Sequence, residues 1–130
     1  MSRILNGMRC IAMEFVFNDC NACMNPNVHK ILTKEPFVAS VKTACYMGKW
    51  YYGYDYTNTL DGWEGGASAP NKWHGAEKFD TEQEAIKYAV ENVIIAKLLS
   101  IIKRQPEFKD ICQRLIGQCQ DSITFQPTLF

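Results

Sequence analysis

Residues 38–56, "VASVKTACYMGKWYYGYDY", decide the fold, because two runs of strand-forming residues are separated only by Gly48 and Lys49. Glycine followed by any residue suits a two-residue turn of type II′, so this stretch predicts a β-hairpin. The turn also sets the register, in which the facing pairs are Met47 with Trp50, Cys45 with Tyr52, Thr43 with Tyr54, and Val41 with Tyr56. These eight side chains share the more apolar face, which we expect to meet the core.

The opposite face of the predicted hairpin carries a second aromatic set. The facing pairs there are Tyr46 with Tyr51, Ala44 with Gly53, and Lys42 with Asp55. The last is a cross-strand charge pair worth about 0.2–1 kcal/mol, which favours this register. If the face is open, Tyr46 and Tyr51 form an aromatic platform; the alternative is that the N-terminal strand or a loop folds across the face and buries it.

Two helices are predicted after the hairpin. Thr81 to Glu84, "TEQE", has the spacing of a capping box, and apolar residues then recur at helical spacing as far as Ile102. Pro106 suits the first turn of a second helix, whose apolar stripe is Phe108, Ile111, Cys112, Leu115, Ile116 and Cys119. We therefore expect one α+β domain over residues 1–130, an antiparallel sheet around the hairpin with one face covered by an αα-hairpin of about 81–104 and 106–120.

Three further segments have weaker patterns. Alternating apolar residues predict a strand over 9–17, and Asn25 before Pro26 resembles a cap that starts a short helix over 27–33. Residues 58–75 contain four glycines and read as a long loop, which carries Trp63, Trp73 and His74. A short strand within 73–79 is left open. Such long loops are usually functional or mobile.

Composition excludes several classes of protein. The chain has 130 residues, with 14 Lys plus Arg against 14 Asp plus Glu, so no net charge draws it onto nucleic acid or an acidic lipid surface. No apolar run reaches the roughly 18–20 residues of a membrane-spanning helix. No secretory signal is recognisable, so we expect a cytoplasmic protein whose six cysteines are reduced thiols.

Patterns that carry chemistry are sparse. "CNAC", from Cys20 to Cys23, lacks the second pair of ligands that a structural zinc site needs, unless Cys10, Cys45 or His29 completes it. His74 could titrate usefully in its loop or simply be solvated, and "GWEGGASAP" lacks the Lys-Ser/Thr ending of a phosphate-binding loop. We expect no catalytic residue, no bound metal and no cofactor.

The combination "GKWYYGY", then Gly65, Gly66, Ser68 and Pro70, then "FDTEQEAIKYA" resembles a segment of small accessory proteins from bacterial plasmids, integrative elements and phages. The resemblance covers roughly residues 41–89. Some of those proteins accompany DNA-modification modules. The resemblance implies an accessory role in a mobile element and assigns no functional residue.

These observations favour a non-enzymatic protein of a mobile element or phage that binds a protein partner. The candidate binding residues are Tyr46, Tyr51, Lys42, Trp63, Trp73 and His74. One alternative is a nucleic-acid-binding module that uses the same face, and a second is a small zinc or thiol protein centred on Cys20 and Cys23. The apolar last helix, followed by Phe125, Leu129 and Phe130, also predicts self-association.

Overall fold

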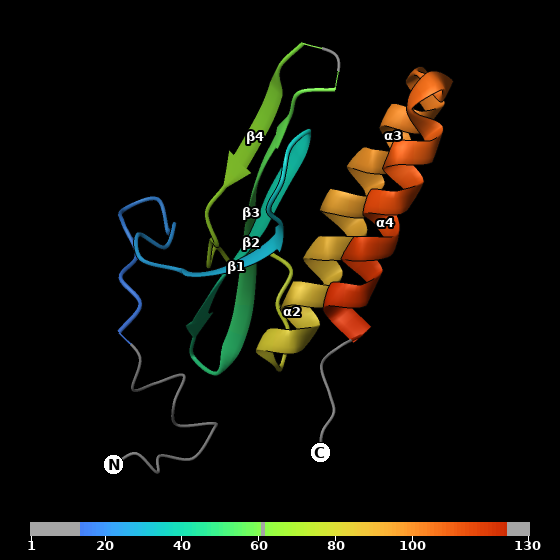
Figure 1. Ribbon diagram of the computed structural model, residues 1–130. Coiled ribbons are helices and arrows are strands. Elements are labelled where there is room, and N and C mark those ends of the chain that lie inside the picture. The colour runs from blue at the N-terminus through green and yellow to red at the C-terminus, as the bar shows by residue number, and fades with distance from the viewer. Residues whose placement is uncertain (1–13, 61, 125–130) are drawn as a thin grey trace.

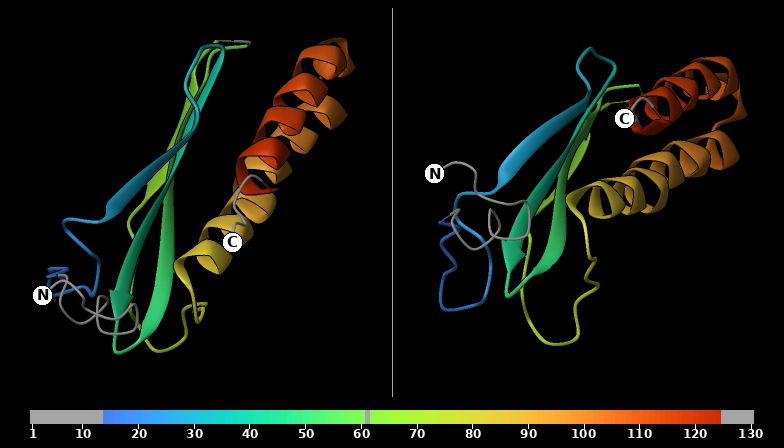
Figure 2. Two further views of the ribbon diagram at one scale, coloured as in Figure 1. Left: turned by 60° about the horizontal axis from the view of Figure 1, so that its bottom comes forward. Right: turned by 90° about the horizontal axis from the view of Figure 1, so that it is seen from below.

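A computed structural model describes residues 14–60 and 62–124 and contains a four-stranded antiparallel sheet in the order β1-β2-β3-β4 (Figure 1). The strands are β1 (Asn27–Leu32), β2 (Phe37–Tyr46), β3 (Lys49–Asn58) and β4 (Glu64–Ser68). The helices pack against one face of the sheet. The segment before β1, residues 14–26, lies on the opposite side (Figure 2). The predicted α+β architecture is therefore confirmed.

The central hairpin forms, but its turn differs from the prediction. Met47 (φ +53°) and Gly48 (φ +80°) occupy the two central positions, so the turn is type I′, which needs a positive φ at both. Tyr46 pairs with Lys49, and every β2–β3 pair is shifted by two residues from the predicted register. Because side chains alternate with a period of two, this shift leaves each residue on its predicted face.

The shift removes one predicted interaction. Lys42 pairs with Gly53, and Asp55 pairs with Ser40, so the predicted Lys42–Asp55 pair is wrong. The inner face still meets the core as expected, since Val41, Thr43 and Cys45 are buried there. Met47 is the exception, because it has moved into the turn and is 80% exposed.

Two of the strands lie in segments for which the sequence predicts a helix or a loop. The short helix predicted over 27–33 is instead β1, which pairs with β2 and contains a bulge between Lys30 and Leu32. The long loop predicted over 58–75 contains β4, which pairs with the end of β3 from Tyr54 to Asn58. In both cases pairing with a neighbouring strand outweighs local propensity. The strand suggested within 73–79 is reduced to one bridge, between Phe79 and Trp50.

The helical layer agrees closely with the prediction. The first helix comprises α2 (Glu82–Ala89), a π-helical segment (Val90–Ile95) and α3 (Ala96–Arg104). Its capping box is present: the Glu84 N–H donates to Thr81 Oγ1 at 3.1 Å, and the Thr81 N–H donates to Glu84 Oε1 at 3.3 Å. A 3₁₀ turn (Pro106–Phe108) then leads into α4 (Lys109–Thr124), which runs beside α3 (Figure 1).

The core lies between the sheet and these helices. Its largest fully buried side chains are Phe37, Val41, Val90, Ile94, Leu98 and Ile101. The predicted stripe of α4 joins this cluster through Cys112, Leu115 and Cys119. That stripe is therefore used within the chain, and self-association through it stays a prediction. Residues 9–13, 125, 129 and 130, which carried further predictions, lie outside the described residues.

A substitution in the turn tests the observed register. Asparagine tolerates a left-handed backbone better than methionine does, so Met47→Asn should raise the free energy of unfolding by roughly 1 kcal/mol. Met47→Ala, which keeps the conformational cost, serves as the control. Urea unfolding followed by circular dichroism measures both. In the predicted type II′ turn residue 47 would have a negative φ, so an Asn variant no more stable than the Ala variant would contradict the observed turn.

Candidate functional site

The outer sheet face is closed at its hairpin end by two chain segments. The Cys23 N–H donates to the Pro70 carbonyl at 2.7 Å, and the Lys72 N–H donates to the Asn21 carbonyl at 2.9 Å. The loop that begins at Ala69 crosses directly over Gly53, where a Cβ atom would lie 2.2 Å from the Ser68 carbonyl oxygen. Only glycine allows this close approach.

This cover separates the two tyrosines of the predicted platform. Tyr51 is only 6% exposed, so it offers no stacking surface. Tyr46 is 40% exposed, but the Phe17 ring packs edge-on at 5.7 Å and the Lys72 ammonium lies 4.4 Å from its ring centroid. Lys42 is half-buried opposite Gly53. The burial alternative therefore holds for Tyr51, and an open pair of stacking rings is not present.

On the inner face a half-buried polar cluster joins the sheet to the start of α2. The Glu82 carboxylate accepts hydrogen bonds from Thr43 Oγ1 at 2.7 Å, from His29 Nε2 at 3.0 Å and from Asn27 Nδ2 at 3.0 Å. Burial alone would raise the pKa of Glu82, but these hydrogen bonds outweigh burial and lower the pKa to about 2. The cluster thus fixes an ionised carboxylate between β1, β2 and α2.

This cluster does not have the geometry of a nucleophilic site. The Thr43 hydroxyl lies 2.9 Å from His29 Nε2, but it donates its proton to the Glu82 oxygen that also accepts from His29, so His29 is not free to take that proton as a base. Thr43 is also fully buried and out of reach of a substrate. We therefore assign the cluster to holding α2 against the sheet.

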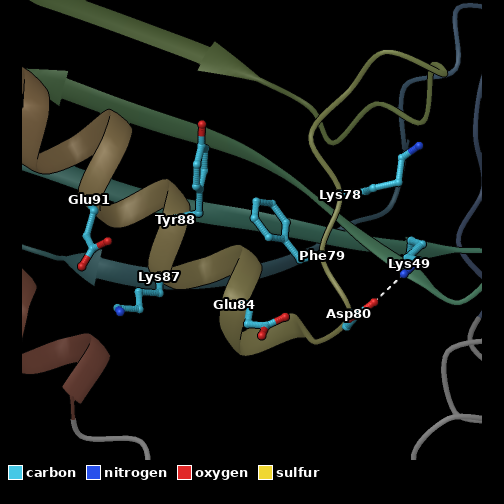
Figure 3. A pocket seen from close by; sticks show the side chains of 8 residues that line it. All are labelled: Lys49, Lys78, Phe79, Asp80, Glu84, Lys87, Tyr88 and Glu91. Carbon is cyan, nitrogen blue, oxygen red and sulfur yellow. Dashed lines mark hydrogen bonds and ion pairs between the residues drawn. The ribbon is translucent and has the colours of Figure 1, made fainter.

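A shallow pocket of about 520 Å³ lies where the loop enters α2 (Figure 3). Its charged lining residues are Lys49, Lys78, Asp80, Glu84, Lys87 and Glu91. Lys49 is paired with Asp80, while Lys78 points away from that pair and Lys87 and Glu91 lie along the outer side of the helix (Figure 3). Positive and negative groups are interspersed, so the pocket does not concentrate charge of one sign on a ligand.

The cysteines do not converge on a site either. Cys20 is exposed and Cys23 is buried, and both are free thiols. Burial raises the pKa of Cys119 to about 12, so that thiol stays protonated. Cys45 is disulfide-bonded, which corrects the expectation of six reduced thiols. Over residues 14–60 and 62–124 no group of three or more His, Cys, Asp or Glu side chains is placed to hold a metal ion.

β4 forms one of the two free edges of the sheet. β4 is the last strand in the sheet order, and Gly65 and Ala67 in it are exposed. Its first residue is held to α3, because Lys97 Nζ lies 2.7 Å from the Glu64 carboxylate and lowers its pKa. The strand is therefore fixed at one end and open along its outer side.

Two of the candidate binding residues, both tryptophans, lie near this edge. Trp63 is 72% exposed and precedes β4, and its ring lies over Gly65, where a Cβ atom would come within 2.8 Å of it. Trp73 is 50% exposed in the loop that follows β4, and the His74 ring packs against it at 5.5 Å. The structure thus places the Trp63 ring over the start of β4, and Trp73 with His74 in the loop that follows its other end.

The sequence does not reveal this edge, because "EGGAS" reads as part of a loop. Pro70 and the four small residues of that stretch hide the strand pattern. Its position shortly after the hairpin was the available signal, since consecutive strands commonly pair.

Comparison with known proteins adds no family assignment. No protein-family model, no curated protein and no solved structure matches this chain. Among the described helices none is long and apolar enough to cross a membrane.

The Glu82 cluster makes a pH-dependent prediction. A carboxyl whose pKa is lowered by folding stabilises the native state above its unfolded pKa near 4.5 and loses that contribution as pH falls towards about 2. Glu82→Gln should therefore be less stable than the wild type at pH 7, by up to about 3 kcal/mol, with a difference that shrinks between pH 5 and pH 2. Urea unfolding at several pH values measures this, and exposed Glu91→Gln is the control. A difference that is constant with pH would contradict the assignment.

Proposed function

We propose that this protein is a non-enzymatic interaction module that binds an extended segment of a partner protein along the free edge of β4. The supporting observation is that Gly65 and Ala67 are exposed on an edge beyond which no other strand lies in the described part of the chain. An added strand would pair its own N–H and C=O groups with this edge.

The direction of the backbone groups follows from the hairpin. In an antiparallel ladder the N–H and C=O of successive residues point alternately to the two neighbouring strands. Trp50 exchanges both bonds with Phe79, at 2.8 and 2.9 Å, so the even-numbered residues of β3 point away from β2. Tyr54 and Tyr56 then bond to Ser68 and Gly66, which leaves the backbone groups of Gly65 and Ala67 directed outward.

The two edges of the sheet differ in how they resist such pairing. β1, the other edge strand, carries the exposed Lys30 and a bulge beside it, and both features disfavour edge-to-edge association. β4 has neither, and its outward positions are glycine and alanine. Only the short length of β4 limits pairing on this side. This asymmetry supports β4 as the edge that receives a partner.

The flanking tryptophans supply the apolar contacts that an edge of small residues lacks. Tryptophan is enriched among residues that dominate binding energy at interfaces. Trp63 and Trp73 are both at least half-exposed, so neither is needed in full for the core. His74 extends the contact at the Trp73 end.

A nucleic-acid partner is less well supported. The chain has a formal net charge of 0, so it does not attract nucleic acid as a whole. That alternative also needs Tyr46 and Tyr51 as an open pair for base stacking, and Tyr51 is buried. The association with a mobile element or phage stays a prediction from the resemblance.

A single edge substitution tests strand addition. A display library of random 12-residue peptides is selected for binding to the protein. A synthetic copy of the enriched peptide is then titrated into the protein, and its affinity is measured by calorimetry. Ala67→Pro removes an outward N–H while sparing the bonds to β3, and should weaken binding more than about tenfold through loss of that bond and its neighbours. Ala67→Val, which keeps the N–H, is the matched control.

Amide exchange provides the structural readout of the same experiment. On peptide binding the Gly65 and Ala67 amides should gain protection, whereas those of Gly66 and Ser68 are already bonded to β3. Urea unfolding of Ala67→Pro checks that the sheet is intact. Selection of no peptide, or equal binding by a folded Ala67→Pro variant, would overturn the proposal.

A further inference from the structure

A gap in the β3–β4 ladder lies directly beyond the end of β4. Tyr54 pairs with Ser68, and Trp50 pairs with Phe79, but Tyr52 between them has no strand partner on this side within the described chain. The chain after Ser68 instead crosses over Gly53 and forms a bridge to Ala22 through Asn71. By the alternation of the ladder, the N–H and C=O of Tyr52 point into this gap.

The gap opens into a pocket of about 320 Å³, large enough for a side chain. Its walls include Tyr52, Tyr54 and Trp73, and the last residue of β4, Ser68, forms part of its rim. The pocket is therefore contiguous with the edge on which the partner segment is proposed to dock. An added strand would lie about 4.8 Å from β4, within reach of the pocket for a long side chain.

The charge of the lining has one sign. Glu77 is the only carboxylate among the lining residues, which include no lysine, arginine or histidine. Within the described residues Glu77 forms no ion pair, unlike Glu64, Asp80 and Glu82. Lys78, its neighbour in sequence, lines the pocket beside α2 instead.

The carboxylate and the aromatic residues line the same pocket. Burial raises the pKa of the Tyr52 phenol, and Tyr88 and Glu77 raise it further. Aromatic faces attract cations, and an unpaired carboxylate beside them adds to that attraction. The Tyr52 carbonyl offers a further acceptor. Such a set of groups suits a cationic side chain and disfavours an acidic one.

We propose that this pocket receives a basic side chain, lysine or arginine, from the partner segment that docks on β4. The inference rests on the proposed function, because the docked strand brings the side chain to the rim at Ser68. It specifies the partner as an extended segment with a basic residue at the position that lies beside the end of β4.

The test uses the selected peptide and the full chain. Amide protection locates the peptide positions nearest Ser68, and peptides are made with lysine, arginine or norleucine at each of them. At one position either basic residue should bind about tenfold more tightly than norleucine, a range typical of a partly desolvated cation–π contact. The lysine and arginine peptides together show which cation the pocket prefers.

A double-mutant comparison assigns that preference to the pocket. On Glu77→Gln the advantage of the basic residue should fall below about threefold, whereas on Glu91→Gln, which removes the same charge from an exposed site on the first helix, it should persist. Urea unfolding confirms that both variants are folded.

The outcomes separate the two proposals. Suppose that Ala67→Pro weakens binding, but that no basic residue is preferred or that the preference survives in Glu77→Gln. Docking on β4 then stands, and the inference about the pocket is wrong. If binding is insensitive to Ala67→Pro, docking on β4 is wrong and the inference fails with it.

Discussion

The left-handed turn at Met47 and Gly48 is the constraint on which the rest of this structure depends, because it determines which backbone groups of β3 face each neighbour. With Tyr46 and Lys49 as the closing pair, odd-numbered residues of β3 bond to β2 and even-numbered residues bond outward. The pairing of Trp50 with Phe79, the partners of Tyr54 and the gap at Tyr52 all follow from that alternation. A turn shifted by one position would move every one of them.

The two faces of the sheet are covered in different ways, and the difference leaves one edge accessible. The helices cover the inner face with apolar side chains, while the outer face is covered at its hairpin end by backbone-paired segments near Cys23 and Pro70. Those segments need Gly53 beneath them, and they draw the chain out of the sheet after Ser68. The same departure that closes over Tyr51 therefore ends β4 early and creates the pocket beside it.

Much of the fold could be predicted from the sequence because several of its signals are local. The capping box at Thr81 and the stripe of the last helix need no knowledge of distant partners. The face assignment of the hairpin is correct although its register is not, since an error of two residues preserves the alternation. β1 could not be predicted in this way, because Asn25 and Pro26 imitate a helix start and only pairing with β2 makes that segment a strand.

The candidate site was predictable only in part, for the same reason. Trp63, Trp73 and His74 were identified as aromatic residues in a glycine-rich segment, but the burial of Tyr51 depends on a contact between chain segments far apart in sequence. The free edge of β4 also arises from pairing, which converts a stretch with low strand propensity into a strand with exposed backbone groups.

The composition of that edge limits how a partner can gain affinity. Glycine and alanine bury little apolar surface, so ladder hydrogen bonds, each worth only about 0.5–1.5 kcal/mol net, cannot offset the ordering of a peptide over a strand as short as β4. Small residues do allow close backbone approach without selecting a side chain. For a partner segment docked on β4 as we propose, specificity and most of the binding energy would come from the ends, where Trp63 and Trp73 lie. Under that proposal the edge is permissive along its length and selective at its two ends, because the sheet supplies the small residues and the flanking loops supply the tryptophans.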